Sequence, residues 1–257
     1  MKIASWNVNS LRLRLPQIIA WITENKPDVL GVQETKVTDE QFPHVELTAL
    51  GYKVLYTGQK SYNGMAMMIK ESHTIQDVHL EMPGFQDVAK RFMAVTVAGV
   101  RVVNIYVPNG SSVGSEKYHY KLKWLTALHL ALQQELHSHA QVLVMGDFNI
   151  APEDRDVHDP IAWQGHVLVS PLERAALAEI CRLGMQDAFR LFEQAEKSFS
   201  WWDYRAASFR RNAGLRIDLI LLNTALAQRC RGCYIDKGPR KNEQPSDHTP
   251  VWVELDL

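Results

Sequence analysis

Two short stretches, IASWNVN at residues 3–9 and VLVMGDFN at residues 142–149, share one pattern and indicate the fold. Each is a largely apolar run that ends in a polar residue, any residue and then an asparagine. Such a run is typical of a strand that is buried on both faces. One such strand in each half of the chain predicts an α/β four-layer sandwich, in which two related β-sheets pack face to face with helices outside.

The pattern of the remaining sequence predicts further strands and helices in addition to these two strands. Apolar residues recur at helical spacing over 14–25, 116–138 and about 171–183, which predicts three helices. Four short apolar runs between 52 and 108, separated by turn residues, indicate an antiparallel sheet. The predicted strands are 2–9, 28–34, 52–58, 64–70, 92–99, 101–108, 141–150, 198–208, 215–223 and 249–257, and residues 151–170 are expected to form a polar loop.

The composition is that of a folded globular protein and excludes a disordered chain. Hydrophobic residues make up 46% and charged residues 22% of the 257 residues. Because no Ser/Gly-rich linker separates the halves, we expect residues 1–257 to form a single domain. The chain has 28 Lys and Arg against 29 Asp and Glu, a formal net charge of −1, so any polyanionic partner must be held by a local patch.

The cysteines and the first residues indicate a reducing compartment. Cys181 stands alone, and Cys230 and Cys233 form one Cys-x-x-Cys pair without the further ligands of a zinc site. We therefore expect reduced thiols near the surface. The first ten residues hold no apolar signal segment, and no run approaches the ~18 apolar residues of a membrane span. These observations predict a cytoplasmic protein with no membrane association.

Six polar side chains interrupt apolar runs at the ends of predicted strands. Strand ends at one edge of a sandwich can converge, and carboxylate and amide oxygens are ligands that Mg²⁺ or Mn²⁺ prefers. The six residues are Asn7, Glu34, Asp147, Asn149, Asp247 and His248. Taken together they predict a divalent-metal site.

Another acidic residue, Asp218, lies inside the apolar segment LRIDLILL at residues 215–222. Burying an unpaired charge costs several kcal/mol, so this carboxylate needs a partner. The imidazolium of His248 is a natural one.

At these positions the sequence resembles the exonuclease III type of abasic-site endonucleases, within the endonuclease/exonuclease/phosphatase superfamily. The resemblance runs from end to end through eight segments in order. They are SWNVNSLR (5–12), VLGVQETK (29–36), SYNGMAMM (61–68), NIYVPNG (104–110), VMGDFNIAP (144–152), SWWDYR (200–205), GLRIDLIL (214–221) and PSDHTPV (245–251). The resemblance implies a deoxyribonuclease I-like fold and Mg²⁺-dependent hydrolysis of phosphodiester bonds in DNA.

The resemblance also implies roles for the polar residues at the strand ends. Glu34 is similar to the family's main metal carboxylate, with Asn7 and Asp247 close to the metal or orienting it. Asp147 resembles the general base that takes a proton from the attacking water, and Asn149 the amide that orients this water and the phosphate.

The remaining implied catalytic residues contact the phosphate. His248 resembles the imidazole that donates a hydrogen bond to the scissile phosphate and is held by Asp218, while Tyr106 and Asn109 match the family's Tyr-x-Pro-Asn motif. Phosphodiester hydrolysis requires stabilisation of extra negative charge on oxygen, which a metal, an imidazolium and amide donors supply.

Local patches must bind the DNA. Residues 201–216 interleave basic and aromatic side chains, a mixture that suits phosphates and unstacked bases or sugars. They include Trp201, Trp202, Tyr204, Arg205, Phe209, Arg210, Arg211 and Arg216. By resemblance, Arg12, Lys36, Tyr62 and Arg91 face the DNA backbone or minor groove, and Trp201 and Leu215 line the pocket for a sugar that lacks its base.

The implied partner is double-stranded DNA with abasic sites or with damaged or recessed 3′ ends, bound by a monomer that associates with the nucleoid. Asn9 stands where some relatives carry an aspartate, so the sequence does not decide whether the site holds one metal ion or two. The loop 153–170 is the least matched segment. Bulky residues around His166 and Leu168 could close the abasic pocket, so an enzyme that acts only as an exonuclease remains an alternative. Two further functions compete with these: a phosphatase that acts on an inositol lipid or sphingolipid, and a non-catalytic nucleic-acid-binding relative.

Overall fold

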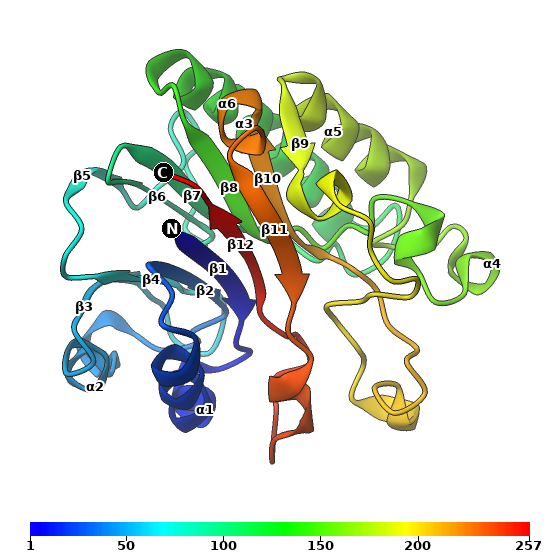
Figure 1. Cartoon of the computed structure of the whole chain (residues 1–257). Coiled ribbons are helices and arrows are strands. Elements are labelled where there is room, and N and C mark those ends of the chain that lie inside the picture. Colours follow the sequence, from blue (N-terminus) through cyan, green and yellow to red (C-terminus); the bar gives the residue numbers. More distant parts are fainter.

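The computed structural model describes all 257 residues and contains two six-stranded mixed sheets packed face to face, with helices on both outer faces (Figure 1). The first sheet contains, in spatial order, β11 (Cys230–Ile235), β12 (Val251–Leu255), β1 (Lys2–Asn7), β2 (Val29–Gln33), β4 (Met65–Lys70) and β3 (Tyr52–Thr57). The second contains β5 (Ile75–His79), β6 (Phe92–Val97), β7 (Val100–Tyr106), β8 (Val142–Asp147), β10 (Asp218–Asn223) and β9 (Met185–Asp187). The predicted four-layer α/β sandwich is confirmed.

The two sheets repeat one pairing pattern around β1 and β8, the strands of the two matching stretches. β1 pairs parallel with β2 and antiparallel with β12, and β8 pairs parallel with β7 and antiparallel with β10. The parallel neighbours β2 and β7 then pair antiparallel with β4 and β6. The equivalent strands therefore bring their polar ends to the same end of the sandwich.

Three apolar layers hold the sandwich together. Between the sheets, Ile3, Val29 and Met67 pack in one core with Val102 and Leu143 of the other sheet. A second core packs α3 (Glu116–Ser138) and α5 (Pro171–Arg182) on the second sheet, and a third packs α1 (Leu11–Asn25) on the first. Since the central core draws on both halves of the chain, one domain remains our prediction.

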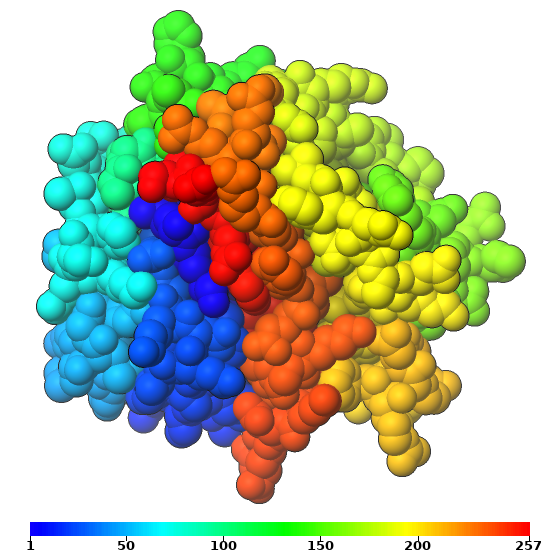
Figure 2. All heavy atoms as spheres, viewed as in Figure 1, coloured from blue at the N-terminus to red at the C-terminus, as the bar shows by residue number.

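The short elements complete the connections between these layers. Helices α2 (His44–Thr48), α4 (Pro160–Trp163) and α6 (Thr224–Ala227) are each one turn or little more. The 3₁₀ turns are η1 (Asp39–Gln41), η2 (Asp154–Asp156), η3 (Ala188–Leu191), η4 (Arg205–Ala207) and η5 (Gly238–Lys241). Figure 2 shows the segment around η5, in orange-red, and the loop around η4, in gold, projecting at the same end of the molecule.

The structure corrects four expectations. The runs between 52 and 108 belong to two sheets rather than one, because β3 and β4 join the first sheet while β6 and β7 join the second. Residues 198–208 form no strand: Trp201 makes only isolated bridges, and the backbone turns into η4, where Trp202 and Tyr204 pack against Arg240 of another loop. Strands β5, β9 and β11 and helices α2, α4 and α6 had not been predicted, and α4 lies within the expected loop 151–170. Cys233 on β11 is buried rather than near the surface.

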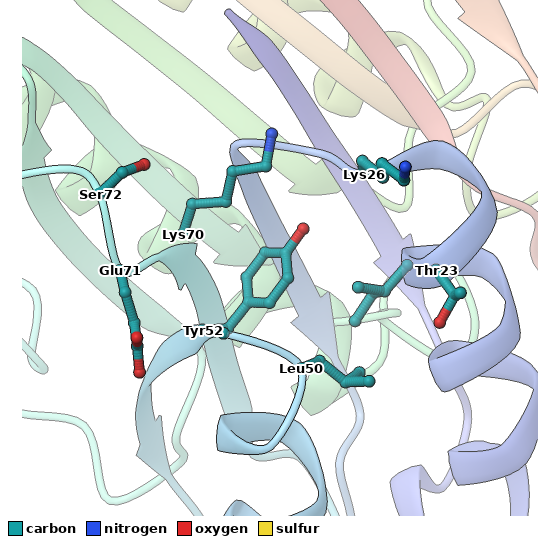
Figure 3. Close-up of a pocket in the computed structure, with 9 residues that line it drawn as sticks. Thr23, Lys26, Leu50, Tyr52, Lys70, Glu71 and Ser72 are labelled. Carbon is teal, nitrogen blue, oxygen red and sulfur yellow. The ribbon is translucent and has the colours of Figure 1, made fainter.

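No helix in the chain combines the length and the apolar character needed to cross a membrane. A hollow of about 440 Å³ opens at the end of the first sheet where α1 ends, with Lys26, Tyr52 and Lys70 in its wall (Figure 3). Two of its polar groups already have partners: Lys70 pairs with Asp28 at 3.0 Å, and the Tyr52 hydroxyl donates to the carbonyl of Pro27 at 2.7 Å.

Candidate active site

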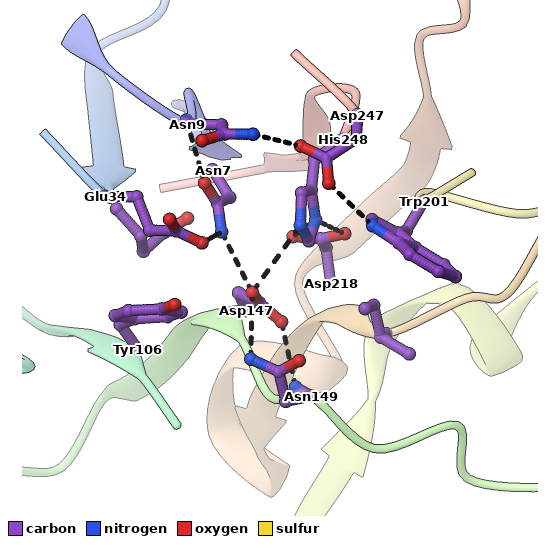
Figure 4. Close-up of polar contacts among 12 residues, drawn as sticks. Asn7, Asn9, Glu34, Tyr106, Asp147, Asn149, Trp201, Asp218, Asp247 and His248 are labelled. Atoms are coloured by element: carbon purple, nitrogen blue, oxygen red, sulfur yellow. Dashed lines mark hydrogen bonds and ion pairs between the residues drawn. The ribbon is translucent and has the colours of Figure 1, made fainter. Parts of the chain in front are cut away.

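The predicted catalytic and metal-binding residues meet at the other end of the sandwich, where β1, β2 and β8 end and β10 and β12 begin (Figure 4). Asn7 ends β1, and Glu34 follows β2, the parallel neighbour of β1. In the second sheet, Asp147 pairs in register with both Tyr106 and Asp218. Strand pairing therefore gathers polar side chains at one edge of each sheet, and the face-to-face packing of the sheets brings the two sets together.

Asn7 links the carboxylates of the two sheets. Its fully buried amide nitrogen donates to Glu34 Oε1 at 2.8 Å and to Asp147 Oδ2 at 2.9 Å. Its amide oxygen accepts from the backbone N–H of Asn9 at 3.0 Å. In this arrangement the Asn7 nitrogen donates to both acids, and the Asn7 oxygen is turned away from them toward the backbone of Asn9.

Asp147 is buried and surrounded by amide donors. The backbone N–H of Asn149 donates to its Oδ1 at 2.9 Å, and the side-chain amide of Asn149 to its Oδ2 at 3.1 Å. Burial raises the pKa of Asp147 to about 7, with further contributions from the negative charges of Asp218 and Glu34, against the opposing charge of His248. A carboxylate with such a pKa can accept a proton near neutral pH.

His248 is held between two acids. Its Nδ1 lies 2.9 Å from Asp218 Oδ2, and its Nε2 lies 3.7 Å from Asp147 Oδ2. Burial alone disfavours the imidazolium, but Asp218 and Asp147 outweigh burial and raise the pKa of His248 to about 10. Ser200 completes the arrangement by donating to Asp218 Oδ2 at 2.6 Å. His248 is therefore a cation at neutral pH.

Glu34 stands at the open side of the cluster. Its backbone is left-handed, with φ of 54°, and its Oε2 lies 2.8 Å from Lys36 Nζ. Although burial favours its neutral form, Lys36, the Asn7 hydrogen bond and His248 hold the pKa of Glu34 below its usual value. Glu34 is thus ionised and available to a cation.

Asp247 points away from the other carboxylates. Its Oδ1 accepts from the Asn9 amide at 2.8 Å, and its Oδ2 accepts from the Trp201 indole at 2.9 Å. These hydrogen bonds and the charge of His248 outweigh burial and keep the pKa of Asp247 low. In this arrangement Asp247 orients Trp201.

Three side chains offer atoms within 4.8 Å of one another that suit a metal ion: Glu34, Asp147 and His248. The two carboxylates provide hard oxygen donors without any thiolate, which fits Mg²⁺ or Mn²⁺. An imidazolium carries a proton on both ring nitrogens and has no lone pair for a metal, so the donor set that fits the ion is Glu34 and Asp147.

A family model, the endonuclease/exonuclease/phosphatase family, matches residues 4–248. The chain belongs to this family. Over 99% of its length it is 38% identical to the full length of an exodeoxyribonuclease III from Haemophilus influenzae. It is 40% identical, over the whole of both chains and with a TM-score of 0.97, to a 3′ phosphatase from Neisseria solved with a product DNA hairpin. An AP endonuclease from Archaeoglobus fulgidus is 39% identical over both full chains, with a TM-score of 0.95.

These comparisons confirm the resemblance to the exonuclease III type. The motif that carries Tyr106 and Asn109 borders the carboxylates in this family member. Burial, with the charges of Glu34 and Asp147, raises the pKa of Tyr106 well above its usual value, so its phenol keeps its proton. Asn109 donates to the side-chain oxygen of Asn149 at 3.2 Å.

The residues expected to face DNA differ in exposure. Arg12 is exposed, and Tyr62 is 70% exposed. Arg91 is half-buried, with its guanidinium 4.5 Å from the centre of the Tyr106 ring. Arg205 is exposed and pairs with Asp203 at 2.6 Å. Lys36 pairs with Glu34 and so stands beside the carboxylates.

Three residues of the predicted DNA-binding segment lie inside the protein instead. Leu215 is fully buried in a cluster with Val157, Leu168 and Ile217, so it supports the half-buried Trp201 from behind and is not exposed to DNA. Arg216 is buried between Asp156 and Asp187, and Trp202 is also fully buried.

Sequence reasoning missed several partners of the site. Ser200, Lys121 and Glu173 are all fully buried: Ser200 contacts Asp218, Lys121 contacts Asn149, and Glu173 pairs with Lys121. Only Lys121 left a signal, because it falls on the apolar stripe of the helix at 116–138 between Tyr118 and Leu125.

Proposed function

We propose that this member of the exonuclease III type is a metal-dependent DNA-repair nuclease that hydrolyses phosphodiester bonds of duplex DNA at abasic sites and at 3′ ends. The observation that carries the proposal is the buried pair of Asp147, whose pKa is raised to about 7, and His248, whose pKa is raised to about 10. One group accepts a proton at neutral pH while the other stays positively charged beside it. Such a pair suits general-base attack of water on a phosphodiester.

In the proposed reaction Asp147 takes the proton from the attacking water. Asn149, held by hydrogen bonds to Asp147 and to the carbonyl of Val107 at 3.0 Å, orients the water and the phosphate. The imidazolium of His248 stabilises negative charge that develops on the phosphoryl oxygens, and Asp218 fixes its orientation. Tyr106 and Asn109 are proposed as further donors to the phosphate.

We propose that Glu34 and Asp147 hold a divalent cation, Mg²⁺ or Mn²⁺. When bound, such a cation supplies positive charge to the phosphoryl and leaving oxygens. Asn7 orients both carboxylates through its amide, and Asp247 orients Trp201 and Asn9. Because every residue of the proposed set comes from one chain, we propose a monomer as the active form.

The substrate proposal is tested on three labelled duplexes, which carry a recessed undamaged 3′ end, a 3′-phosphate or an internal abasic site. Initial rates are compared for the wild-type protein in Mg²⁺. We expect shortening of the first, dephosphorylation of the second and incision 5′ to the abasic site in the third. If none of the three reacts, the proposed function is wrong.

One observation favours a second candidate, an enzyme confined to 3′ ends. The ring of Trp163 stands edge-to-face against Trp201, with centroids 6.5 Å apart, and His166 lies 6.1 Å from Trp163 by the same measure. These bulky rings border the place proposed for the extrahelical abasic sugar. Digestion of recessed ends without incision of the abasic duplex supports this candidate, and Trp163→Ala is then expected to increase abasic incision relative to 3′ digestion.

A further inference from the structure

A buried ion pair lies directly behind the proposed phosphate-binding amides. Lys121 on α3 and Glu173 on α5 are both fully buried, and their charged groups contact each other. Lys121 Nζ also donates to the backbone carbonyl of Asn149 at 2.6 Å and to that of Asn109 at 3.2 Å. One ammonium thus reaches the backbones of both residues.

Glu173 extends these contacts to a third segment. Its Oε1 accepts from the backbone N–H of Leu168 at 3.0 Å, and its Oε2 accepts from that of Ser170 at 3.1 Å. Leu168 lies in the buried cluster against which Trp201 packs. The ion pair therefore joins the loops after β7 and β8 to the loop that ends at α5.

These loops have backbone conformations that need external support. Asn149 has φ of 49°, Ser111 of 62° and Leu168 of 77°, all in the left-handed region that residues other than glycine rarely adopt. Gly110, with φ of 94°, passes so close that a Cβ atom there would stand 3.2 Å from Lys121 Cδ. Such conformations persist only where the surrounding contacts fix them.

We infer that Lys121 is a positioning residue for hydrolysis. Through its bonds to two carbonyls it holds the side chains of Asn109 and Asn149 toward the phosphate, and through Glu173 it couples them to the loop beside Trp201. The inference rests on the proposed function, because it assigns the two amides to the substrate. If the pair served only to satisfy its own charges, its replacement by a neutral pair would leave turnover unchanged.

The test therefore uses Lys121→Met/Glu173→Gln, which removes both charges together. Lys121→Met alone leaves a buried unpaired carboxylate and confounds turnover with stability. Glu173→Gln alone keeps the two bonds from Lys121 to the carbonyls and serves as the matched single variant. Because it leaves the buried ammonium without its carboxylate, its kcat is compared only on protein that circular dichroism shows to be fully folded. Lys123→Met, on the exposed face of the same helix, controls for the loss of a lysine.

The readouts are kcat and KM on a recessed duplex, together with hydrogen–deuterium exchange of the peptides that cover residues 107–112 and 147–152. For the double variant we expect kcat to fall about 10- to 100-fold, as for misplaced catalytic groups, with KM within about 3-fold of wild type. Exchange should rise in both peptides. Glu173→Gln should keep kcat within about 3-fold of wild type, and Lys123→Met should match wild type.

Wild-type kcat in the double variant, or a loss of kcat in Glu173→Gln as large as in the double variant, would overturn the inference. Should the double variant not fold, Lys121→Gln in the Glu173→Gln background replaces it, with the same expected directions. If the wild-type protein cleaves no duplex, the proposed function fails, and the exchange data alone decide whether Lys121 orders the two loops. Unchanged exchange in that case rejects the inference as well.

Discussion

Asp147 is the residue on which the proposed chemistry depends most. Asp147→Asn keeps the shape of the side chain, but it exchanges one accepting oxygen for a donor and cannot accept a proton. Removing a well-placed general base typically lowers the rate by ~10² to 10⁴. We expect a fall in kcat of this order with duplex affinity retained, measured by single-turnover cleavage and by titration of labelled DNA. Near-wild-type turnover would mean that Asp147 is not the base.

The pH profile tests the pair that Asp218 forms with His248. Activity needs the Asp147 carboxylate and the His248 imidazolium, so it is lost as pH falls through about 7 and as pH rises through about 10. A bound cation favours the carboxylate and moves the acid limb lower. Asp218→Asn removes the main negative charge that stabilises the imidazolium, so the alkaline limb of kcat/KM should move toward neutral pH.

An undamaged recessed duplex is the proper substrate for that profile, because abasic DNA breaks in alkali without an enzyme. The acid limb provides the internal control, since Asp218→Asn removes a negative charge that also raises the pKa of Asp147, and it should move only slightly and to lower pH. An alkaline limb that stays in place would show that His248 does not set it.

At the residue scale, the sequence predicts which residues form the site better than it predicts which of their atoms contact each other. The polar residues at the strand ends do meet, because β1 pairs parallel with β2 and β7 pairs parallel with β8, so both strands of each pair end at the same edge of their sheet. The direction of each hydrogen bond was not predictable: the Asn7 amide donates to both acids, and Asp247 turns toward Trp201. Such choices depend on neighbours that are distant in sequence.

The loop 201–212 is the element that should respond most to a change far from the reaction. Arg240, on η5, lies 5.0 Å from the ring centre of Phe209, 5.7 Å from that of Tyr204 and 5.9 Å from that of Trp202. Its Nη1 also donates to the carbonyl of Ser246 at 2.5 Å. These contacts tie the two projections in Figure 2 together.

Arg240→Gln removes the cation from this aromatic cage and should loosen the loop that presents Arg210 and Arg211. Each cation–π contact contributes about 0.5–2 kcal/mol, so we expect the Kd for duplex to rise about 3- to 10-fold with kcat at saturating DNA retained. Lys241→Gln removes the same charge from an exposed neighbour and is the control. Equal effects of the two substitutions would mean that only net charge matters.

Elements with a strong hydrophobic periodicity were predicted well. The helix at 116–138 was placed with its observed ends, because its apolar stripe is long and Ser115 caps its first turn by accepting from the N–H of Tyr118. The strand predicted over 198–208 was wrong, because Trp202 and Tyr204 pack around Arg240 rather than in a sheet. The division of residues 52–108 between two sheets was missed because alternation along a strand does not say which sheet the strand joins.

For the whole molecule, a formal net charge of −1 means that DNA affinity arises from local patches. The affinity for DNA should therefore fall with added salt, with a slope set by the number of basic side chains that contact phosphate. We expect Arg210→Ala/Arg211→Ala to reduce the slope of log K against log salt by about 0.9 for each arginine that contacts phosphate. Arg182→Ala, exposed on α5, should leave the slope unchanged, and an unchanged slope in the double variant would place the DNA elsewhere.

The central claim is that a divalent cation held at Glu34 and Asp147 enables this protein to hydrolyse DNA. The most direct measurement is the initial rate on a recessed 3′ duplex in EDTA, and again after Mg²⁺ or Mn²⁺ is added in excess, for the wild type and for Glu34→Ala. We predict that EDTA abolishes cleavage, that either cation restores it, and that Glu34→Ala needs more metal and turns over more slowly. Full activity of the wild type in EDTA, or an unchanged metal requirement in Glu34→Ala, would contradict the account.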